Sequence, residues 1–244
     1  MSTARRVDQA LVERGFFDSR ARAQAAIKAG RVKLDGVTLS KASALIAPDA
    51  ALEASPEHPY VSRGALKLVA ALDDHGRQPE GLACLDVGTS TGGFCEVLLL
   101  RGARHVVAVD VGHDQLHPKL VGHPRLTLLE GRDARTLTAH DLATPPQMIT
   151  IDVSFISLTK ILGPVLALAA PDAVLVALVK PQFEVGRAFV GKGVVRDAQA
   201  RQRACDDICA FITAMGWQID GLKVSPLQGG AGNIEYLLTA RRPQ

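Results

Sequence analysis

The sequence predicts an α/β protein in which a seven-stranded, mostly parallel sheet follows a small N-terminal α+β domain. Segments with the patterns of strands and helices alternate from residue 60 onward, which is typical of a parallel sheet covered by helices on both faces. A glycine-rich turn joins one of these strands to the next helix. The charge is unevenly distributed, because residues 1–41 carry nine Lys or Arg and four acidic residues, a net charge of +5, whereas the rest of the chain carries −2.

The first domain is predicted to contain two short helices followed by short strands. Ser19 is a suitable N-cap for the second helix, and Gly30 is a suitable C-cap. A basic, compact surface of this kind indicates a nucleic-acid-binding module, although a solvated basic face without a partner would look the same on charge alone. The expected elements are helices over Val7–Arg14 and Arg20–Ala29, and strands over Arg31–Leu34 and Val37–Leu39, joined by the tight turn Asp35-Gly36.

The second domain begins after a linker. Ser55–Pro59 contains two prolines and no periodicity, which excludes a helix there. We therefore expect domains over residues 1–55 and 62–244, joined by residues 56–61. The last two strands are separated by Ser225–Gly232, which is too short for a crossover helix, so we expect an antiparallel hairpin at the edge of the sheet. The expected strands are Cys84–Val87, Val106–Asp110, Leu126–Leu129, Met148–Val153, Ala173–Val179, Trp217–Val224 and Ile234–Thr239, and the expected helices are Gly64–Asp74, Gly93–Arg101, Ile156–Ala169 and Asp197–Met215.

One apolar segment, residues 161–179, has the composition of a membrane span. Pro164, Pro171 and Asp172 interrupt it, so we interpret it as the end of a helix, a turn and a buried strand rather than a span of about 20 residues. No signal-peptide pattern precedes the first domain, and the four cysteines form no C-x-x-C pair. We therefore expect a cytoplasmic protein with free thiols, and no motif predicts a bound metal.

The strongest local motif is the turn Asp86–Phe94, which follows an apolar strand and opens a helix. Its glycines allow a tight turn and a close approach of the backbone to a ligand. Asp110 ends the next strand, where an acidic residue accepts hydrogen bonds from ribose hydroxyls. Asp133 follows the third strand, where it either meets an adenine edge or is a simple turn residue. The candidate cofactor-binding residues are Asp86, Gly88, Ser90, Thr91, Gly92, Gly93, Phe94, Asp110 and Asp133.

Three kinds of cofactor site compete for this turn. It lacks the Gly-Lys-Ser/Thr of a nucleoside triphosphate loop and the G-x-G-x-x-G spacing of a dinucleotide site. The acidic-x-G-x-G-x-G form of methyltransferases fits better, with Ser90 in place of the middle glycine. On this turn alone, a dinucleotide enzyme and a purely structural turn remain open alternatives.

Charged residues also stand at the ends of the strands. Asp152 closes one strand, Lys180 closes the next and Glu235 begins the last. Ligands of open α/β sheets bind outside the carboxyl ends of the strands, and an antiparallel strand starts at that same edge. We therefore expect the three charges to converge on one crevice, although a single charge at a strand end is usually a solvated boundary residue. Lys67, on the helix before the glycine-rich turn, is a fourth candidate.

Two parts of the sequence resemble known families. The first domain is similar to the small RNA-binding fold of bacterial ribosomal protein S-four in Val7–Val12, Ser19-Arg20, Ala26–Gly30, Val32 and Asp35-Gly36. Five segments, in the right order over nearly the whole chain, resemble the TlyA family, which is named after haemolysin but methylates ribosomal RNA. These segments are Ser62–Leu68, Asp86–Phe94, Asp152–Ser157, Val179–Gly186 and Gly232–Tyr236.

The TlyA resemblance implies a Rossmann-like class I methyltransferase that uses S-adenosylmethionine to methylate the ribose 2′-hydroxyl of cytidine in ribosomal RNA. The family is similar to the FtsJ-type ribose methyltransferases, whose Lys-Asp-Lys-Glu tetrad maps by motif to Lys67, Asp152, Lys180 and Glu235. The chain stops soon after its last strand, which resembles relatives that modify only the large-subunit 23S RNA, so 23S RNA is expected ahead of 16S RNA. A membrane-active haemolysin and a non-catalytic RNA-binding protein are the alternatives; the first requires an apolar span or a strongly amphipathic helix.

The reaction explains why such a site needs charges. A ribose hydroxyl is a poor nucleophile and must lose its proton as it attacks the methyl group. We hypothesise that Lys180 orients this hydroxyl and accepts or stabilises its proton, while Asp152 and Glu235 hold the lysines. In-line alignment of the reacting atoms would be the main contribution of the protein. The ribosomal RNA phosphates are expected to meet Arg6, Arg20, Arg22, Lys28, Lys33 and Lys41, with Arg63 near the target ribose. The glycine-rich loop Phe183–Asp197 either closes over the RNA or is a plain surface loop.

Overall fold

The computed structural model describes residues 4–17 and 19–243, and the chain divides into two compact units between Pro59 and Tyr60. In the first unit, two helices pack on short strands around an aliphatic core that includes Val7, Leu11 and Ile27. Strands β2, β3 and β5 form an antiparallel sheet in the order β3-β2-β5, and β1 pairs with β4. The elements are β1 (Arg5–Arg6), α1 (Val7–Glu13), α2 (Arg20–Lys28), β2 (Val32–Leu34), β3 (Val37–Thr38), β4 (Leu45–Ile46) and β5 (Leu52–Ala54).

The N-cap of α2 was predicted correctly, and its C-cap lies one residue earlier than predicted. The Ser19 hydroxyl accepts a hydrogen bond from the backbone N–H of Arg22, as an N-cap does. The C-cap is Ala29 rather than Gly30, and Gly30 follows it in the left-handed conformation (φ 70°). Strands β1, β4 and β5 were not predicted, because two or three residues are too few to show a period-2 pattern.

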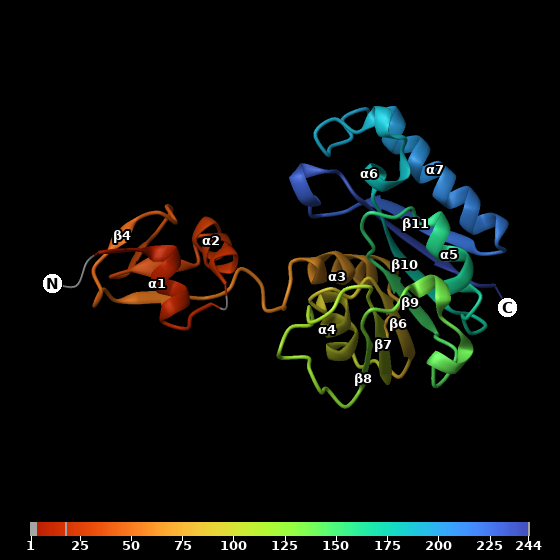
Figure 1. Cartoon of the computed structure of the whole chain (residues 1–244), viewed down its shortest axis with the longest axis horizontal. Coiled ribbons are helices and arrows are strands. Elements are labelled where there is room, and N and C mark those ends of the chain that lie inside the picture. Colours follow the sequence, from red (N-terminus) through yellow and green to blue (C-terminus); the bar gives the residue numbers. More distant parts are fainter. Residues whose placement is uncertain (1–3, 18, 244) are drawn as a thin grey trace. The chain divides into compact units, whose positions relative to one another are not determined.

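The second unit is built on a seven-stranded sheet in the order β11-β12-β10-β9-β6-β7-β8 (Figure 1). The five strands from β10 to β8 are parallel, and β12 is antiparallel to both β10 and β11. This confirms the predicted mostly parallel sheet with an antiparallel pair at its edge. The strands are β6 (Ala83–Val87), β7 (His105–Val109), β8 (Leu126–Leu129), β9 (Met148–Ile151), β10 (Val174–Val179), β11 (Gln218–Val224) and β12 (Tyr236–Arg241).

Helices cover both faces of this sheet. Leu85, Ile149 and Leu175 point to one face and pack with α5 and α7, whereas Cys84, Met148 and Val176 point to the other face and pack with α3 and α4. Because both faces are covered, β10 is buried along its whole length and its sequence is continuously apolar. The helices are α3 (Gly64–His75), α4 (Gly93–Leu100), α5 (Thr159–Leu166), α6 (Pro181–Glu184) and α7 (Ala198–Ala214), with 3₁₀ turns at η1 (Ala134–Thr136), η2 (Ala139–Asp141), η3 (Arg187–Phe189) and η4 (Gly230–Gly232).

The apolar segment 161–179 is divided between α5 and β10 and does not form one helix. Across residues 4–17 and 19–243, no helix combines the length and the apolar character that a membrane crossing requires. Helix α5 begins at Thr159, three residues later than the predicted Ile156, and Leu158 is its N-cap.

Strand register places four positions at one edge of the sheet. Val87 and Ala177 both pair with Ile151, and Val179 pairs with Tyr236. The residues that follow β6, β9 and β10, together with the residue that precedes β12, therefore lie side by side at the carboxyl edge. Those residues are Gly88, Asp152, Lys180 and Glu235.

Candidate active site

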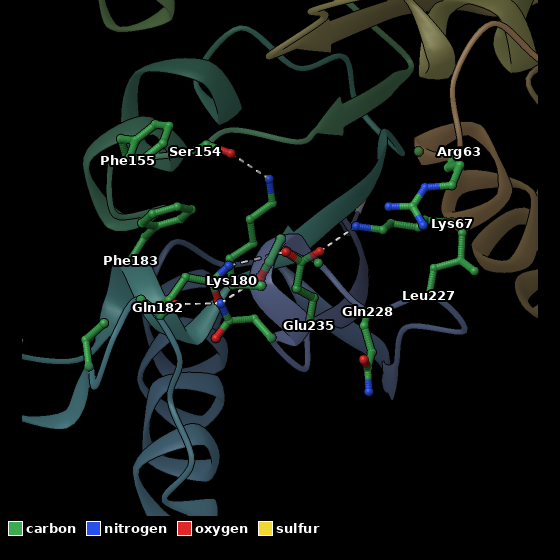
Figure 2. Close-up of a pocket in the computed structure, with 17 residues that line it drawn as sticks. Arg63, Lys67, Ser154, Phe155, Lys180, Gln182, Phe183, Leu227, Gln228 and Glu235 are labelled. Atoms are coloured by element: carbon green, nitrogen blue, oxygen red, sulfur yellow. Dashed lines mark hydrogen bonds and ion pairs between the residues drawn. The ribbon is translucent and has the colours of Figure 1, made fainter. Parts of the chain in front are cut away.

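Two lysine–carboxylate pairs form at this edge of the sheet. The Lys180 Nζ lies 2.6 Å from the Asp152 Oδ1, and the Lys67 Nζ lies 2.5 Å from the Glu235 Oε2. Lys67 reaches Glu235 from α3, and Lys180 extends from the end of β10 toward Ser154, to whose hydroxyl it donates at 3.0 Å (Figure 2). The structure thus brings together all four charged residues that the sequence singled out. As two ion pairs, their charges balance locally.

The two pairs differ in their access to solvent. The side chain of Glu235 is 3% exposed, whereas that of Asp152 is 23% exposed. The second oxygen of Glu235 accepts a hydrogen bond from the Gln182 amide at 3.3 Å. A Cβ at Gly229 would overlap the Glu235 carboxylate, so glycine is required where this loop crosses over it. Glu235 is therefore enclosed, and Asp152 remains partly open.

A cavity of about 450 Å³ lies beside Asp152, at the end of β6, β7 and β9. Its lining contains four of the nine predicted cofactor-binding residues, namely Gly88, Ser90, Asp110 and Asp133. Gly88 has φ 86°, and a Cβ there would lie 2.5 Å from the backbone oxygen of Asp152, so only glycine fits between the two strand ends.

Asp110 organises the turn at the mouth of this cavity. Its Oδ2 accepts from the backbone N–H of Ser90 at 2.7 Å, and its Oδ1 accepts from the backbone N–H of Gly112 at 2.8 Å. Ser90 adopts a left-handed backbone (φ 47°), which this hydrogen bond helps to hold. Each carboxylate oxygen can accept a second hydrogen bond, so Asp110 retains the capacity to bind two hydroxyl groups of a ligand.

Asp86 holds the same turn through hydrogen bonds and is not part of the cavity lining. It is fully buried and accepts hydrogen bonds from the hydroxyls of Thr89 and Thr150 and from the thiol of Cys95. Burial without a cationic partner raises the pKa of Asp86 to about 6, while these hydrogen bonds oppose the shift. Burial likewise raises the pKa of the Cys95 thiol, which keeps it protonated.

Of the remaining predicted residues of the turn, Gly92, Gly93 and Phe94 are buried and packed, whereas Thr91 is exposed. Phe94 is buried in the core between α4 and the sheet. A Cβ at Gly92 would meet Leu116 and Leu120, and a Cβ at Gly93 would overlap the hydroxyl of Ser62, so both glycines allow close packing. The cavity lining does not include Thr91, Gly92, Gly93 or Phe94.

Asp133 lines the cavity, but its carboxylate is already engaged. It caps η1 by accepting from the backbone N–H of Arg135, and the Arg135 guanidinium pairs with it at 2.5 Å. This pairing lowers the pKa of Asp133. A contact between Asp133 and an adenine would therefore share the carboxylate with Arg135, and it stays a prediction.

A second cavity of about 550 Å³ adjoins the first. The two linings share Ser154 and Phe155, and the second also contains Lys67, Lys180 and Glu235. The Lys180–Asp152 pair therefore spans the boundary, with Asp152 on the first cavity and Lys180 on the second. Other residues of the second lining include Arg63, Gln182, Phe183, Val190, Gly193, Leu227 and Gln228.

Phe155 is the most exposed large apolar side chain near the site, at 92%. Its ring lies 5.1 Å from that of Phe183, tilted by 50°, and Figure 2 shows the two rings beside each other at the rim of the second cavity. Exposing an aromatic side chain to water and holding its backbone in the left-handed region both cost free energy. This indicates that a ligand covers Phe155.

Two loops form the far wall of the second cavity, and a buried asparagine joins them. The Asn233 amide donates to the carbonyls of Gly193 and Gly230 at 2.7 and 3.0 Å, and its oxygen accepts from the backbone N–H of Val195. The loop Phe183–Asp197, which was expected to close over a substrate, contains the end of α6, then η3 and a turn that Asn233 anchors. Sequence patterns did not reveal this role, because an isolated asparagine in a loop carries no spacing signal.

The predicted basic residues fall into two groups. Arg6 and Arg20 both pair with the buried Asp8, at 3.0 and 3.1 Å, which holds the pKa of Asp8 well below its usual range. Arg22 lies on α2 beside them and is half-buried. Of the predicted basic residues, Lys28, Lys33 and Lys41 in the first unit and Arg63 at the second cavity are exposed and form no ion pair with another described residue.

Sequence reasoning did not identify Ser154, Phe155, Gln182 or Glu184 as site residues. Ser154 and Phe155 lie within three residues of Asp152, and Gln182 and Glu184 lie within four residues of Lys180. Proximity to the charged strand ends was therefore the signal that could have found them. The exposure and backbone conformation of Phe155 depend on tertiary structure and have no signature in the sequence.

Comparisons with known proteins agree with the fold and with the predicted family. An FtsJ-like methyltransferase model matches residues 60–242, and an S4 domain model matches residues 5–51. The 16S/23S rRNA (cytidine-2′-O)-methyltransferase TlyA of Mycobacterium tuberculosis is 45% identical, over 99% of this chain and 91% of that protein. The 23S rRNA (cytidine-2′-O)-methyltransferase TlyA of Campylobacter jejuni is 40% identical, over 72% of this chain and 69% of that protein.

A solved structure from Streptococcus thermophilus, described as a candidate hemolysin, is 37% identical and has a TM-score of 0.78, covering 100% of this chain and 90% of that chain. Together these matches confirm the α/β methyltransferase fold with an S4 domain at the N-terminus. The chain therefore belongs to the FtsJ-like methyltransferases and, within them, to the TlyA family.

Proposed function

We propose that this chain transfers a methyl group from S-adenosylmethionine to the ribose 2′-hydroxyl of a cytidine in ribosomal RNA. The observation that carries this proposal is the Lys180–Asp152 pair at the boundary of two adjoining cavities. One cavity suits the methyl donor and the other suits the nucleotide, so the pair lies where the two reactants would meet. A transfer between two bound molecules requires this arrangement.

The residues of the first cavity fit S-adenosylmethionine. Asp110 keeps the capacity to accept from two ribose hydroxyls, and the Ser90 turn beside it carries no basic residue of a phosphate-binding loop. When bound, this cofactor supplies a methyl group on a positively charged sulfur. Asp152, which lines the same cavity, would favour a positive charge there.

Lys180 is the residue that would act on the hydroxyl. Two of its three hydrogen-bonding directions are used by Asp152 and Ser154, which fixes the amine and leaves one direction for the substrate. Lys180 would orient the hydroxyl oxygen and accept or stabilise its proton as the oxygen–carbon bond forms and the carbon–sulfur bond breaks. The ribose proton passes to the Lys180 nitrogen or to water as the oxygen becomes a methyl ether.

Lys67 and Glu235 would define the opposite side of the nucleotide site. Because the Glu235 carboxylate is buried, the pair supports the wall of the second cavity and contributes a fixed local field. Phe155 offers a ring on which the base could stack, and Arg63 lies beside Lys67 where it could bind a phosphate (Figure 2). A nucleotide from a folded RNA would have to leave its stack to enter.

The first unit supports ribosomal RNA as the substrate. An S4 domain model matches it, and its exposed lysines suit phosphate contacts. The M. tuberculosis relative is named for both 16S and 23S RNA, and the C. jejuni relative is named for 23S RNA. Because 23S RNA is common to both names, we propose it as the first substrate and 16S RNA as the second.

The test is methyl transfer from radiolabelled S-adenosylmethionine to separate large and small ribosomal subunits that lack the modification. We expect label in 23S RNA, with a block to alkaline cleavage at one or a few cytidines. Label in 16S RNA alone would contradict the subunit assignment. Absence of label in both subunits, while the protein binds S-adenosylhomocysteine, would contradict ribosomal RNA as the substrate.

A further inference from the structure

The wall shared by the two cavities is a loop with little backbone support. It runs from Asp152 to Leu158 and carries Ser154 and Phe155, which line both cavities. In the described chain, none of the backbone N–H groups from Val153 to Ser157 donates to a backbone carbonyl. The left-handed backbone of Phe155 adds strain to this loop. Side chains from elsewhere must therefore hold this loop in place.

Those side chains come from one short segment, Lys180 to Glu184. Lys180 donates to the Ser154 hydroxyl, and the Phe183 ring contacts the Phe155 ring. Glu184 makes the third contact and the most extensive one. Its Oε2 accepts from the Ser157 hydroxyl at 2.6 Å, and its Oε1 accepts from the backbone N–H of Leu158 at 2.9 Å.

Glu184 fixes the loop at the end that Lys180 does not reach. The Leu158 N–H belongs to the start of α5, where helical N–H groups have no partner within the helix. The Ser157 hydroxyl is also within 2.8 Å of the Thr159 hydroxyl, so the carboxylate orders a small hydrogen-bonded cluster. With both oxygens occupied, Glu184 ties the end of β10 to the beginning of α5.

Glu184 is absent from the lining of both cavities, so it does not meet either reactant directly. Its side-chain hydrogen bonds reach the site through the loop that separates the two cavities. Because in-line transfer depends on the distance between hydroxyl and methyl group, a displacement of this wall by about 1 Å can reduce the rate about 100-fold.

We propose that Glu184 is a positioning residue for methyl transfer, which holds the shared wall so that the cofactor and nucleotide cavities stay in register. This inference rests on the proposed function, since it assumes that the two cavities hold the two reactants. Glu184 should therefore affect the rate of methyl transfer when both ligands are saturating, and it should have little effect on the binding of either ligand alone.

The experiment compares Glu184→Ala and Glu184→Gln with the wild type. A glutamine can still accept from Leu158 through its oxygen and donate to Ser157 through its amide, so it should rescue the loop. Single-turnover rates are measured with saturating S-adenosylmethionine and ribosomal RNA, and S-adenosylhomocysteine and RNA affinities are measured separately. Thermal melting reports on folding.

We expect Glu184→Ala to lower the saturated rate by about 10- to 100-fold, with less than about 3-fold change in either affinity. Glu184→Gln should retain most of the wild-type rate. Asp207→Ala is the matched control, because it removes one negative charge from an exposed position on α7 and should leave the rate unchanged. Ser157→Ala removes only one of the two contacts of Glu184. If Glu184→Ala folds poorly, we expect Ser157→Ala to give a smaller loss of the saturated rate, which tests the inference in its place.

Two results would overturn the inference. In the first, Glu184→Ala and Ser157→Ala melt at lower temperature but transfer at the wild-type rate, which would make the contact purely structural. In the second, the whole loss appears in the affinity for one ligand, which would assign Glu184 to one cavity. The wild-type rate reports on the proposed function, and the ratio of variant to wild type reports on Glu184, so the two can fail separately.

Discussion

The two lysine–carboxylate pairs at the sheet edge have the same chemical composition and different surroundings. Lys180 and Asp152 stand at the boundary of the two cavities, and Asp152 remains partly exposed. Lys67 is as buried as Lys180, but the Glu235 carboxylate is enclosed, because Gly229 and Gln182 pack against it. The difference indicates that access to the reactants, and not charge alone, decides which pair can take part in the chemistry.

The enclosed pair has a structural consequence that the open pair lacks. A buried charge that loses its partner cannot be solvated, whereas a partly exposed charge can recover hydration from water. Mutation of the open pair should therefore affect the rate, and mutation of the closed pair should affect stability as well. Each prediction below separates these two effects.

The largest expected effect is on the rate of Lys180→Ala. Loss of the amine that orients the ribose hydroxyl should lower the single-turnover rate by about 10²- to 10⁴-fold. Affinity for S-adenosylhomocysteine should stay within a few-fold, because Lys180 does not line the first cavity. Lys160→Ala, at an exposed position on α5, serves as the charge-matched control. Full turnover by Lys180→Ala with both ligands bound would remove Lys180 from the mechanism.

The second effect is on the stability of Lys67→Met. This change leaves the Glu235 carboxylate buried without a cation and should lower the free energy of unfolding by about 3–5 kcal/mol, measured by urea denaturation. The double variant Lys67→Met with Glu235→Gln should recover part of that loss. Lys223→Met is the contrasting control, because its pair with Asp74 is exposed and contributes at most about 1 kcal/mol. Equal losses for Lys67→Met and Lys223→Met would show that enclosure has no energetic consequence.

The third effect concerns Asp86, a buried carboxyl group that, unlike Asp152 and Glu235, does not pair with a lysine among the described residues. Its pKa of about 6 lies above the usual 3.8, so the folded state holds its proton more tightly than the unfolded state does. The stability it contributes is present below about pH 4 and is lost as the pH rises through about 6, which corresponds to about 3 kcal/mol. Relative to the wild type, Asp86→Asn should therefore become more stable by about that amount between pH 4 and pH 7. Parallel curves of unfolding free energy against pH would show that Asp86 is not protonated preferentially in the folded state.

The smallest effect concerns ion pairing in the first unit. Lys28 has no ion-pair partner among the described residues, whereas Arg20 is held by Asp8. Lys28→Ala should weaken RNA binding by a few-fold and reduce the slope of log affinity against log salt concentration by about 1, because one phosphate contact is lost. Binding titrations at several salt concentrations measure this slope. An unchanged slope would place Lys28 outside the RNA interface.

The sequence was sufficient to predict the sheet and the charged edge, because both follow from local patterns. Continuous apolar runs such as Val174–Val179 mark buried parallel strands, and the charges that end them must gather at one edge. The sequence could not show which glycines of the glycine-rich turn line the cavity and which allow packing, because Gly88 and Gly93 look alike in the sequence. Only the structure shows that Gly88 lines the cavity and Gly93 packs on Ser62. The contacts of Phe155 and Glu184 depend on residues that are about 28 positions apart and have no local signal.

The most direct test of the central claim is the position of the transferred methyl group. Ribosomal RNA that has been modified by the wild-type protein would be digested to nucleosides and examined by mass spectrometry, with fragmentation separating base from ribose. The two-cavity arrangement around Lys180 and Asp152 predicts methylcytidine with the added mass on the ribose. Added mass on the base would contradict it, because a ring atom would then have been the nucleophile and the proposed role of Lys180 toward a hydroxyl would be wrong.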